Sequence, residues 1–142
     1  MTAFHAIALA LGSLLQQDAL RIDEMPMRVC VDAPRAIFQV ENKSAEPVLV
    51  ALSVERWSDE GDTPGWAVVQ EDITQQAAQS KQVRNVKVES RRRRDFAWDL
   101  KKRVGPPPLV TGRHRLVVSY SFSAGDPPGK VTHEFVILDC SG

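Results

Sequence analysis

Apolar side chains recur at every second residue in two long runs of this chain, and this period constrains the fold more than any other feature. The apolar phases of the two runs are Val48, Val50, Leu52 and Val54, then Leu116, Val118, Tyr120 and Phe122. Successive side chains of a β-strand point to opposite faces, whereas an amphipathic helix repeats about every 3.6 residues. Both runs therefore predict strands with one well-buried face.

Shorter runs of the same kind are separated by turn-forming Gly, Pro, Asn and Asp residues. With the apolar stretch around Cys30, about eight strands are predicted, and no amphipathic helix of about 12 residues follows the N-terminal segment. The other predicted strands are residues 36–40, 48–57, 66–70, 82–88, 92–100, 112–122 and 130–138. This pattern predicts an all-β fold, either an antiparallel sandwich or a small barrel.

Two features favour the sandwich over the barrel. Residues 112–122 and 130–138 flank the turn Gly125-Asp126-Pro127-Pro128-Gly129 and form a predicted hairpin. The long connections 58–65 and 71–81 are suited to crossings between two sheets. At 142 residues the chain is long enough to bury one ordinary core.

The N-terminal segment has a composition unlike the rest of the chain. Residues 3–15 read AFHAIALALGSLL and are apolar on every side of a helix. Their length is typical of the apolar h-region of a secretory signal peptide, which predicts a signal peptide over 1–19, a sandwich domain over 20–142, and a secreted or periplasmic protein. The segment lacks Lys and Arg, and this leaves a short buried N-terminal helix or strand as the alternative. No apolar run reaches the roughly 18 residues of a membrane span.

The chain has two cysteines, Cys30 near the start of the domain and Cys140 near its end. A secreted protein with this count favours a disulfide between them, which would act as a structural staple because no CxxC spacing is present. Two buried free thiols are the alternative. Two cysteines are too few for a zinc site built of cysteine alone.

The formal net charge of zero is a cancellation between two blocks. Residues 18–72 carry twelve acidic and five basic side chains, a net −7, and residues 81–103 carry ten basic and three acidic ones, a net +7. If strands 82–88 and 92–100 pair, a basic ridge results. Its predicted anion-binding residues are Arg84, Arg91, Arg92, Arg93 and Arg94.

Such a ridge has two interpretations. It can bind an anionic polysaccharide, a lipid head group or a nucleic acid through guanidinium forks. Alternatively, the arginines are solvated charges that balance the acidic block and discourage edge pairing. The second interpretation is favoured because surface charge runs are common and phosphate-binding domains usually carry a net positive charge.

The chain contains the strand–turn–strand FQVENKSAEPVLVALSV and, further along, FAWDL, a Pro-rich loop and GRHRLVV. Through these segments residues 36–139 resemble bacterial immunoglobulin-like domains. The bacterial intracellular proteinase inhibitor domain has a similar outline. The resemblance implies an immunoglobulin-like sandwich of about 7–8 strands and no particular activity. His114 stands where these domains place a corner tyrosine, which puts the tyrosine-corner hydrogen bond in doubt.

The sequence contains no recognisable catalytic or cofactor-binding motif. His114 and His133 become neighbours if their strands pair, but two imidazoles need a third ligand to hold a metal. Acidic residues of the loop 58–65 can hold calcium only weakly, and solvated charge is the simpler interpretation. Asn42-Lys43-Ser44 matches a glycosylation sequon and is fully explained as a turn. We therefore expect no enzyme, no cofactor and no metal site.

Three functional hypotheses remain. The first is a non-catalytic secreted or periplasmic module that binds a protein through its loops or a sheet face. The second is a proteinase inhibitor that presents an exposed loop, 58–65 or 104–112, to a protease cleft. The third is the binding of an anionic polymer by the arginines named above.

Overall fold

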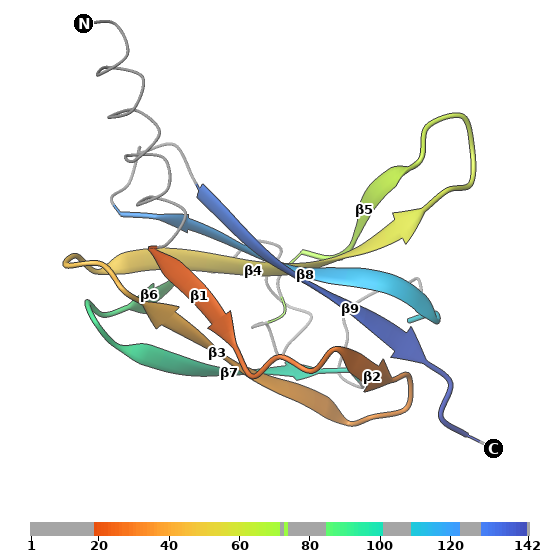
Figure 1. Ribbon diagram of the computed structural model, residues 1–142, viewed down its shortest axis with the longest axis horizontal. Coiled ribbons are helices and arrows are strands. Elements are labelled where there is room, and N and C mark those ends of the chain that lie inside the picture. The colour runs from red at the N-terminus through yellow and green to blue at the C-terminus, as the bar shows by residue number, and fades with distance from the viewer. Residues whose placement is uncertain (1–18, 72, 74–84, 101–108, 123–128, 142) are drawn as a thin grey trace, which may run out of the picture.

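The computed structural model describes residues 19–71, 73, 85–100, 109–122 and 129–141 (Figure 1). This part of the chain is all-β, as predicted. Its strands are β1 (Leu20–Asp23), β2 (Arg28–Cys30), β3 (Arg35–Asn42), β4 (Val48–Ser58), β5 (Gly65–Gln70), β6 (Val86–Val88), β7 (Arg93–Asp99), β8 (Gly112–Ser121) and β9 (Gly129–Leu138).

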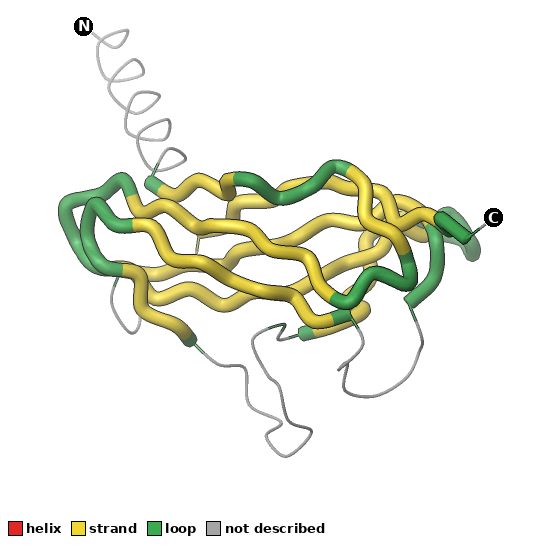
Figure 2. The backbone as a smooth tube through the Cα atoms, turned by 90° about the horizontal axis from the view of Figure 1, so that it is seen from below, coloured by secondary structure: helices red, strands yellow, loops and turns green. Residues whose placement is uncertain are grey.

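The strands form two sheets that pack face to face, and the prediction of a sandwich is confirmed (Figure 2). One sheet has three strands in the order β1-β3-β7. The other has six: β2-β9-β8-β4-β5 lie in that order, and β6 pairs with the other half of the β4 edge. Nine strands are observed, against the predicted 7–8, because β1 lies before the first predicted strand.

The core consists of the inward phase of each predicted alternation. Val48, Val50, Leu52 and Val54 of β4 are fully buried. Trp98 of β7 is also fully buried; it contacts Phe135 of β9 edge-on at 5.8 Å between ring centroids. Since these two aromatic side chains come from opposite sheets, their contact joins the two layers of the sandwich.

The N-terminal part of the domain passes from one sheet to the other. β1 pairs antiparallel with β3 in the three-stranded sheet, and β2 pairs parallel with β9 in the six-stranded sheet. Between them lie Glu24, whose φ is 60°, and Pro26, which fixes its own φ and has no N–H to donate. This segment therefore ends one ladder and begins another.

The prediction about the connections is wrong, and the condition set for the basic ridge is not met. The segments between β4 and β5 and between β5 and β6 are not crossings, because all three strands belong to the six-stranded sheet. The predicted strands 82–88 and 92–100 do not pair: β6 pairs with β4, and β7 pairs with β3 in the other sheet. The turn between them contains Arg91 at φ 61°, and this turn carries the chain across the sandwich.

Asn42 organises the end of the sandwich where this crossing occurs. Its side chain is fully buried, and its Nδ2 donates to the carbonyl oxygens of Glu46, Val88 and Glu89 at 2.8, 3.1 and 3.3 Å. Its Oδ1 accepts from the N–H and the hydroxyl of Ser44. The predicted turn at Asn42 is confirmed, and one amide joins the β3–β4 turn to the β6–β7 turn.

The predicted signal peptide falls almost entirely on residues 1–18, outside the described part of the chain. Its assignment stays a prediction. Among the described residues, no helix has the length and apolar character needed to cross a membrane.

Candidate functional site

The edge of the six-stranded sheet formed by β9 is the candidate site. On one side β9 pairs with β8 over almost its whole length. On the other side β2 covers only Val136, Ile137 and Leu138. Among the described residues, no strand pairs with 129–135 on this second side. We call 129–135 the open stretch of β9.

A disulfide holds β2, which we call the cover strand, in place beside β9. Cys30, the last residue of β2, is bonded to Cys140, which lies just beyond β9, and their Cα atoms are 5.5 Å apart. The predicted pairing is confirmed. The bond closes a chain segment of sequence separation 110, so it restricts the unfolded chain strongly. The open stretch begins beyond the other end of β2, where the N–H of Val136 donates to the carbonyl of Met27.

The backbone groups that face the open side can be assigned from the bonds to the cover strand. The N–H of Val136 donates to the carbonyl of Met27 at 2.9 Å, and the carbonyl of Leu138 accepts from Val31 at 2.8 Å. In an antiparallel strand, alternate residues direct their polar groups to opposite neighbours. The N–H and C=O groups of Lys130, Thr132 and Glu134 therefore point away from β8, along the open edge.

The side chains of the open stretch divide by face. Lys130, Thr132 and Glu134 are exposed on the outer face of the sheet. Val131 and His133 are half-buried on the inner face, where β1 of the other sheet lies close to β9. The inner side chains are thus covered only in part at this edge.

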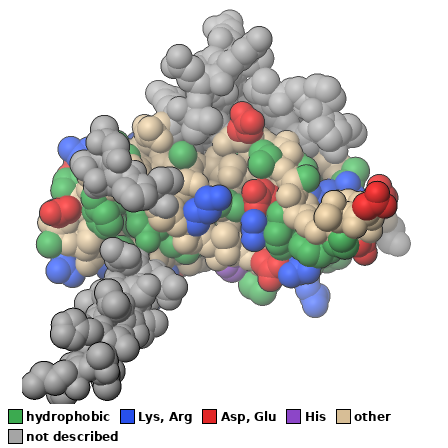
Figure 3. Space-filling view, turned by 90° about the horizontal axis from the view of Figure 1, so that it is seen from above, with side chains coloured by type: hydrophobic (Ala, Val, Ile, Leu, Met, Phe, Trp, Pro, Cys, Tyr) green, Lys and Arg blue, Asp and Glu red, His purple; other side chains and the backbone are tan. Residues whose placement is uncertain are grey.

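Charged and aromatic side chains continue from β9 across the outer face of the sheet. Arg113 donates from Nε and Nη2 to the same oxygen of Glu134, Oε1, at 2.9 and 2.5 Å. Its guanidinium carbon lies 5.1 Å from the ring centroids of both Trp57 and Trp66. Acidic and basic side chains are interspersed with hydrophobic ones in the space-filling view (Figure 3).

The two strand histidines lie on paired strands but not opposite each other. His114 faces Phe135 in the ladder, and His133 faces Leu116. His114 is fully buried, stacks on Phe135, and donates from Nδ1 to the carbonyl of Gly112 at 2.9 Å.

Burial lowers the pKa of His114 from its ordinary value of 6.5, and the positive charge of Arg56 lowers it further. The hydrogen bond to Gly112 opposes this shift but does not reverse it. The ring is therefore neutral at pH 7, and its Nε2 is buried with no hydrogen-bond partner among the described residues. No group of three His, Cys, Asp or Glu side chains able to hold a metal is found in that part of the chain.

The predicted basic ridge is only partly assembled. Arg84 lies outside the described residues. Arg91 donates to the carbonyl of Lys43 at 2.7 Å, Arg93 pairs with Glu41 at 2.6 Å, and Arg94 donates to the carbonyl of Lys87 at 3.0 Å. The pair of Arg93 with Glu41 joins the basic block to the acidic block. These three guanidinium groups already bond within the chain.

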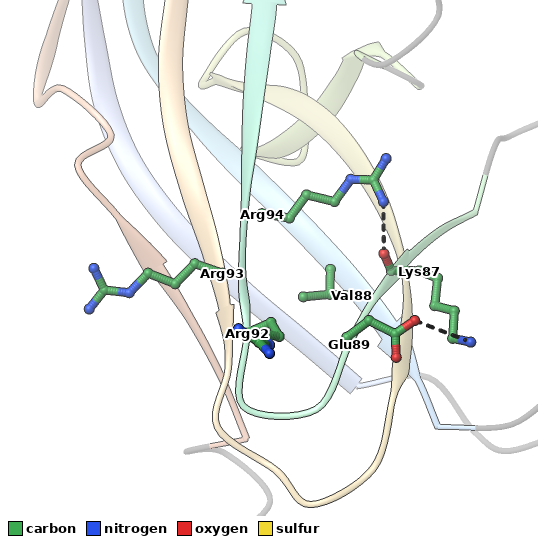
Figure 4. Close-up of a pocket in the computed structure, with 6 residues that line it drawn as sticks. All are labelled: Lys87, Val88, Glu89, Arg92, Arg93 and Arg94. Atoms are coloured by element: carbon green, nitrogen blue, oxygen red, sulfur yellow. Dashed lines mark hydrogen bonds and ion pairs between the residues drawn. The ribbon is translucent and has the colours of Figure 1, made fainter.

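Arg92 lines an open hollow of about 400 Å³ together with side chains of the β6–β7 turn. The hollow also includes Glu89, whose carboxylate pairs with Lys87 at 3.3 Å. In the close-up, Arg93 points away from Glu89 and Lys87, whereas Arg94 points toward the carbonyl of Lys87 (Figure 4). The arginines thus diverge instead of converging on one anion, and anion binding stays a prediction.

Comparisons with known proteins show likeness at the level of the fold. No protein-family model matches the chain, and no curated protein matches it. A crystal structure of the CsuC–CsuE chaperone–tip adhesion subunit pre-assembly complex of Acinetobacter baumannii matches with a TM-score of 0.55 and 12% identity, over 84% of this chain and 51% of that one.

Two further solved structures are similar to the same degree. The E. coli chaperone DraB matches with a TM-score of 0.52 and 12% identity, over 85% of this chain and 55% of that one. The Salmonella enterica SafA pilin in complex with the SafB chaperone matches with a TM-score of 0.51 and 9% identity, over 86% and 55%. This chain therefore spans about half the length of these chains and shares their immunoglobulin-like sandwich. No similarity to a proteinase inhibitor is shown.

Sequence reasoning missed the open stretch of β9 as a site. It predicted the strand 130–138 but looked for function in the arginine run. The available signal was in the last predicted strand, whose outward phase is polar at Lys130, Thr132 and Glu134 before it becomes apolar at Val136 and Leu138. Which side of that strand is unpaired depends on the sheet order, and the sequence does not reveal it.

Proposed function

We propose that this chain is a non-catalytic, secreted or periplasmic module that binds a protein by adding an extended segment of the partner to the open stretch of β9. The observation that supports this function best is the row of backbone groups on Lys130, Thr132 and Glu134 that faces away from β8 and meets no described strand. An edge of this kind is a template for strand addition.

The surroundings of the edge favour a segment in which apolar and polar side chains alternate. On the inner side, Val131 and His133 are half-buried, and Ile22 of β1 packs on the core only in part. Apolar side chains of an added strand would remove more of this surface from water, at roughly 25 cal/mol per Å² of apolar area. Polar side chains of the same segment would lie on the outer face beside Lys130 and Glu134.

Two further observations support an extracytoplasmic protein-binding role. The bond between Cys30 and Cys140 is of a kind that persists in oxidising compartments. Two of the similar structures are described as complexes of a chaperone with a tip adhesion subunit or with a pilin. Those descriptions concern the proteins named in them, and they suggest the class of partner for this fold.

The test uses a proline on the edge strand. The N–H of Thr132 faces the open side, so Thr132→Pro removes a donor needed by an added strand but none that bonds to β8. Thr132→Val keeps the N–H and is the matched control. A displayed library of random nine-residue peptides is selected on the immobilised, well-separated wild-type protein, and the selected peptides are then measured on both variants.

We expect the selected peptides to alternate apolar and polar residues, to bind Thr132→Val as they bind the wild type, and to lose at least about tenfold in affinity for Thr132→Pro. Peptides that bind Thr132→Pro as tightly as the wild type would show that the binding surface lies elsewhere. A selection that yields no binding peptide would also contradict the proposal.

A further inference from the structure

We propose that the partner strand is the β9 of a second copy of this chain, paired antiparallel about a two-fold axis at Thr132. This inference rests on the proposed function, because it names an occupant for the same edge. It goes further in predicting the register and the residues that face one another in the pair.

The open stretch has the symmetry that such a pair requires. It runs from 129 to 135, so Thr132 is its central residue. In an antiparallel pair centred there, Thr132 faces Thr132 and residue 130 faces residue 134 of the other copy. These are the residues whose backbone groups point to the open side, so each facing pair can exchange both of its N–H to O=C bonds.

The charges on the outer face match this register. Lys130 then faces Glu134 of the other copy, and the contact occurs twice because a two-fold interface is isologous. Lys130 makes no ion pair among the described residues. Both hydrogen bonds from Arg113 go to Oε1 of Glu134, which leaves Oε2 for a contact with the other copy. Directly opposite side chains of opposite charge stabilise a strand pair.

Other arrangements of two copies lack this match. A parallel pair in register would place Lys130 against Lys130 and Glu134 against Glu134, and like charges directly opposite each other destabilise a sheet. A shift of the register by one residue would place Val131 and His133 of one copy on the outer face of the other copy's sheet. The antiparallel pair centred on Thr132 instead places Val131 against His133 on the inner face, where both are half-buried.

The covered end of β9 sets the limits of the pair. β2 occupies the edge from Val136 onward, and the disulfide at Cys30 holds it there. An antiparallel neighbour can therefore extend along the open stretch and no further. Because that limit applies to both copies, the two strands can overlap along their open stretches, and the six-stranded sheets join into one continuous sheet.

The experiment measures the mass of the full chain by sedimentation equilibrium over a range of concentrations, with three test variants and one control variant. Lys130→Glu alters a side chain with no described partner and places like charges at both symmetry-related contacts. Glu134→Lys does the same with positive charge, and it also removes the bond to Arg113, so thermal unfolding is recorded for each variant. Thr132→Pro blocks the edge, and Thr132→Val is its control.

We expect a reversible dimer for the wild type and for Thr132→Val, and a monomer for Thr132→Pro. Each charge variant alone should raise the dissociation constant at least about tenfold. An equimolar mixture of isotope-labelled Lys130→Glu and unlabelled Glu134→Lys should form a mixed dimer by native mass spectrometry, because opposite charges then meet at both contacts.

Three results would overturn the inference in distinguishable ways. A wild-type monomer at every concentration that still binds selected peptides at the edge would remove the second copy as occupant and leave the proposed function standing. A dimer unaffected by Thr132→Pro would place self-association on another surface. A dimer lost in Thr132→Pro but unchanged by either charge variant would refute the register.

Discussion

The backbone polar groups are hydrogen-bonded within the chain in one region of this sandwich and face no described strand in another. At the end formed by the β3–β4 and β6–β7 turns, Asn42 and Ser44 bond to the backbone groups of both turns, and Arg91 bonds to the carbonyl of Lys43. Along the open stretch of β9, the groups on Lys130, Thr132 and Glu134 face no described strand. The first region forms its hydrogen bonds within the chain, and the second is the edge to which we propose that a partner strand is added.

The comparison separates a region whose hydrogen bonds stabilise the fold from an edge whose backbone groups face no described strand. A buried amide with several partners is costly to remove, because the groups it bonds would remain buried and unpaired. An exposed edge is solvated in the free protein, so it adds little to stability and loses little when a partner strand replaces water. Substitutions in the first region should therefore lower the free energy of unfolding. Substitutions along the open stretch should alter binding and change stability little.

The largest expected effect on stability follows from removal of the disulfide that anchors the cover strand. Replacing Cys30 and Cys140 together by serine should lower the free energy of unfolding by up to about 4.7 kcal/mol, since the bond closes a long segment of the unfolded chain. Urea unfolding of the variant and the oxidised wild type measures the change. A loss below about 1 kcal/mol would show that the link between β2 and β9 hardly restricts the unfolded chain.

The next effect separates the two regions directly. Asn42→Ala should destabilise the domain by about 3 kcal/mol, because the carbonyls of Val88 and Glu89 lose a buried donor. Lys43→Ala, at the exposed neighbour, is the matched control and should change stability by less than about 0.5 kcal/mol. Thr132→Val in the open stretch should behave like the control. Equal losses in the free energy of unfolding for Asn42→Ala and Thr132→Val would show that the two regions do not differ in their contribution to stability.

A smaller effect is expected from pH, through His114 on the strand next to β9. Its pKa is lower in the folded protein than its ordinary value of 6.5, so its contribution to stability is full above that pH. This contribution is lost as the pH falls below 6.5 toward the folded-state pKa, because the unfolded chain takes up the proton first. His114→Phe should flatten the stability profile between pH 7 and 5. A wild-type profile that is already flat there would contradict the buried neutral ring.

The smallest effects are expected at the arginine run. Arg93→Ser should cost less than about 1 kcal/mol, because its pair with Glu41 is exposed on the arginine side, and Arg92→Ser should be close to neutral. If the run is solvated charge, retention on heparin should change little when all four arginines from 91 to 94 become serine. A large drop in the salt concentration needed for elution would instead support the anion-binding hypothesis.

The fold could be predicted because its strands carry a local signal. The alternation in β4 and β8 needs only the burial of one face, and the burial of Val50, Leu52, Leu116 and Val118 follows it. β1 was missed because four residues, Leu20–Asp23, are too short to show a period. Whether β6 and β7 pair stayed open in the sequence, because a turn between two strands looks the same whether it joins neighbours or opposite sheets.

The site could be predicted less well than the fold. The disulfide followed from the count and position of the cysteines, and the turn at Asn42 from its residue types. The open stretch depends on which strands lie beside β9, and that order is set by contacts between segments more than 100 residues apart, such as Val29 with Ile137. The arginine run is conspicuous in sequence, yet its side chains bond to Glu41 and to nearby carbonyls.

Amide hydrogen exchange followed residue by residue by NMR tests the central claim most directly. In dilute protein, the amides of Thr132 and Glu134 should exchange at least about a hundredfold faster than those of Val131 and His133, which face β8 in the same strand. Asn42, whose amide donates to Arg92, should be protected throughout. At high concentration Thr132 and Glu134 should become protected as the copies pair. Protection of these two amides equal to that of His133 in dilute monomer would show that the edge is already closed within the chain.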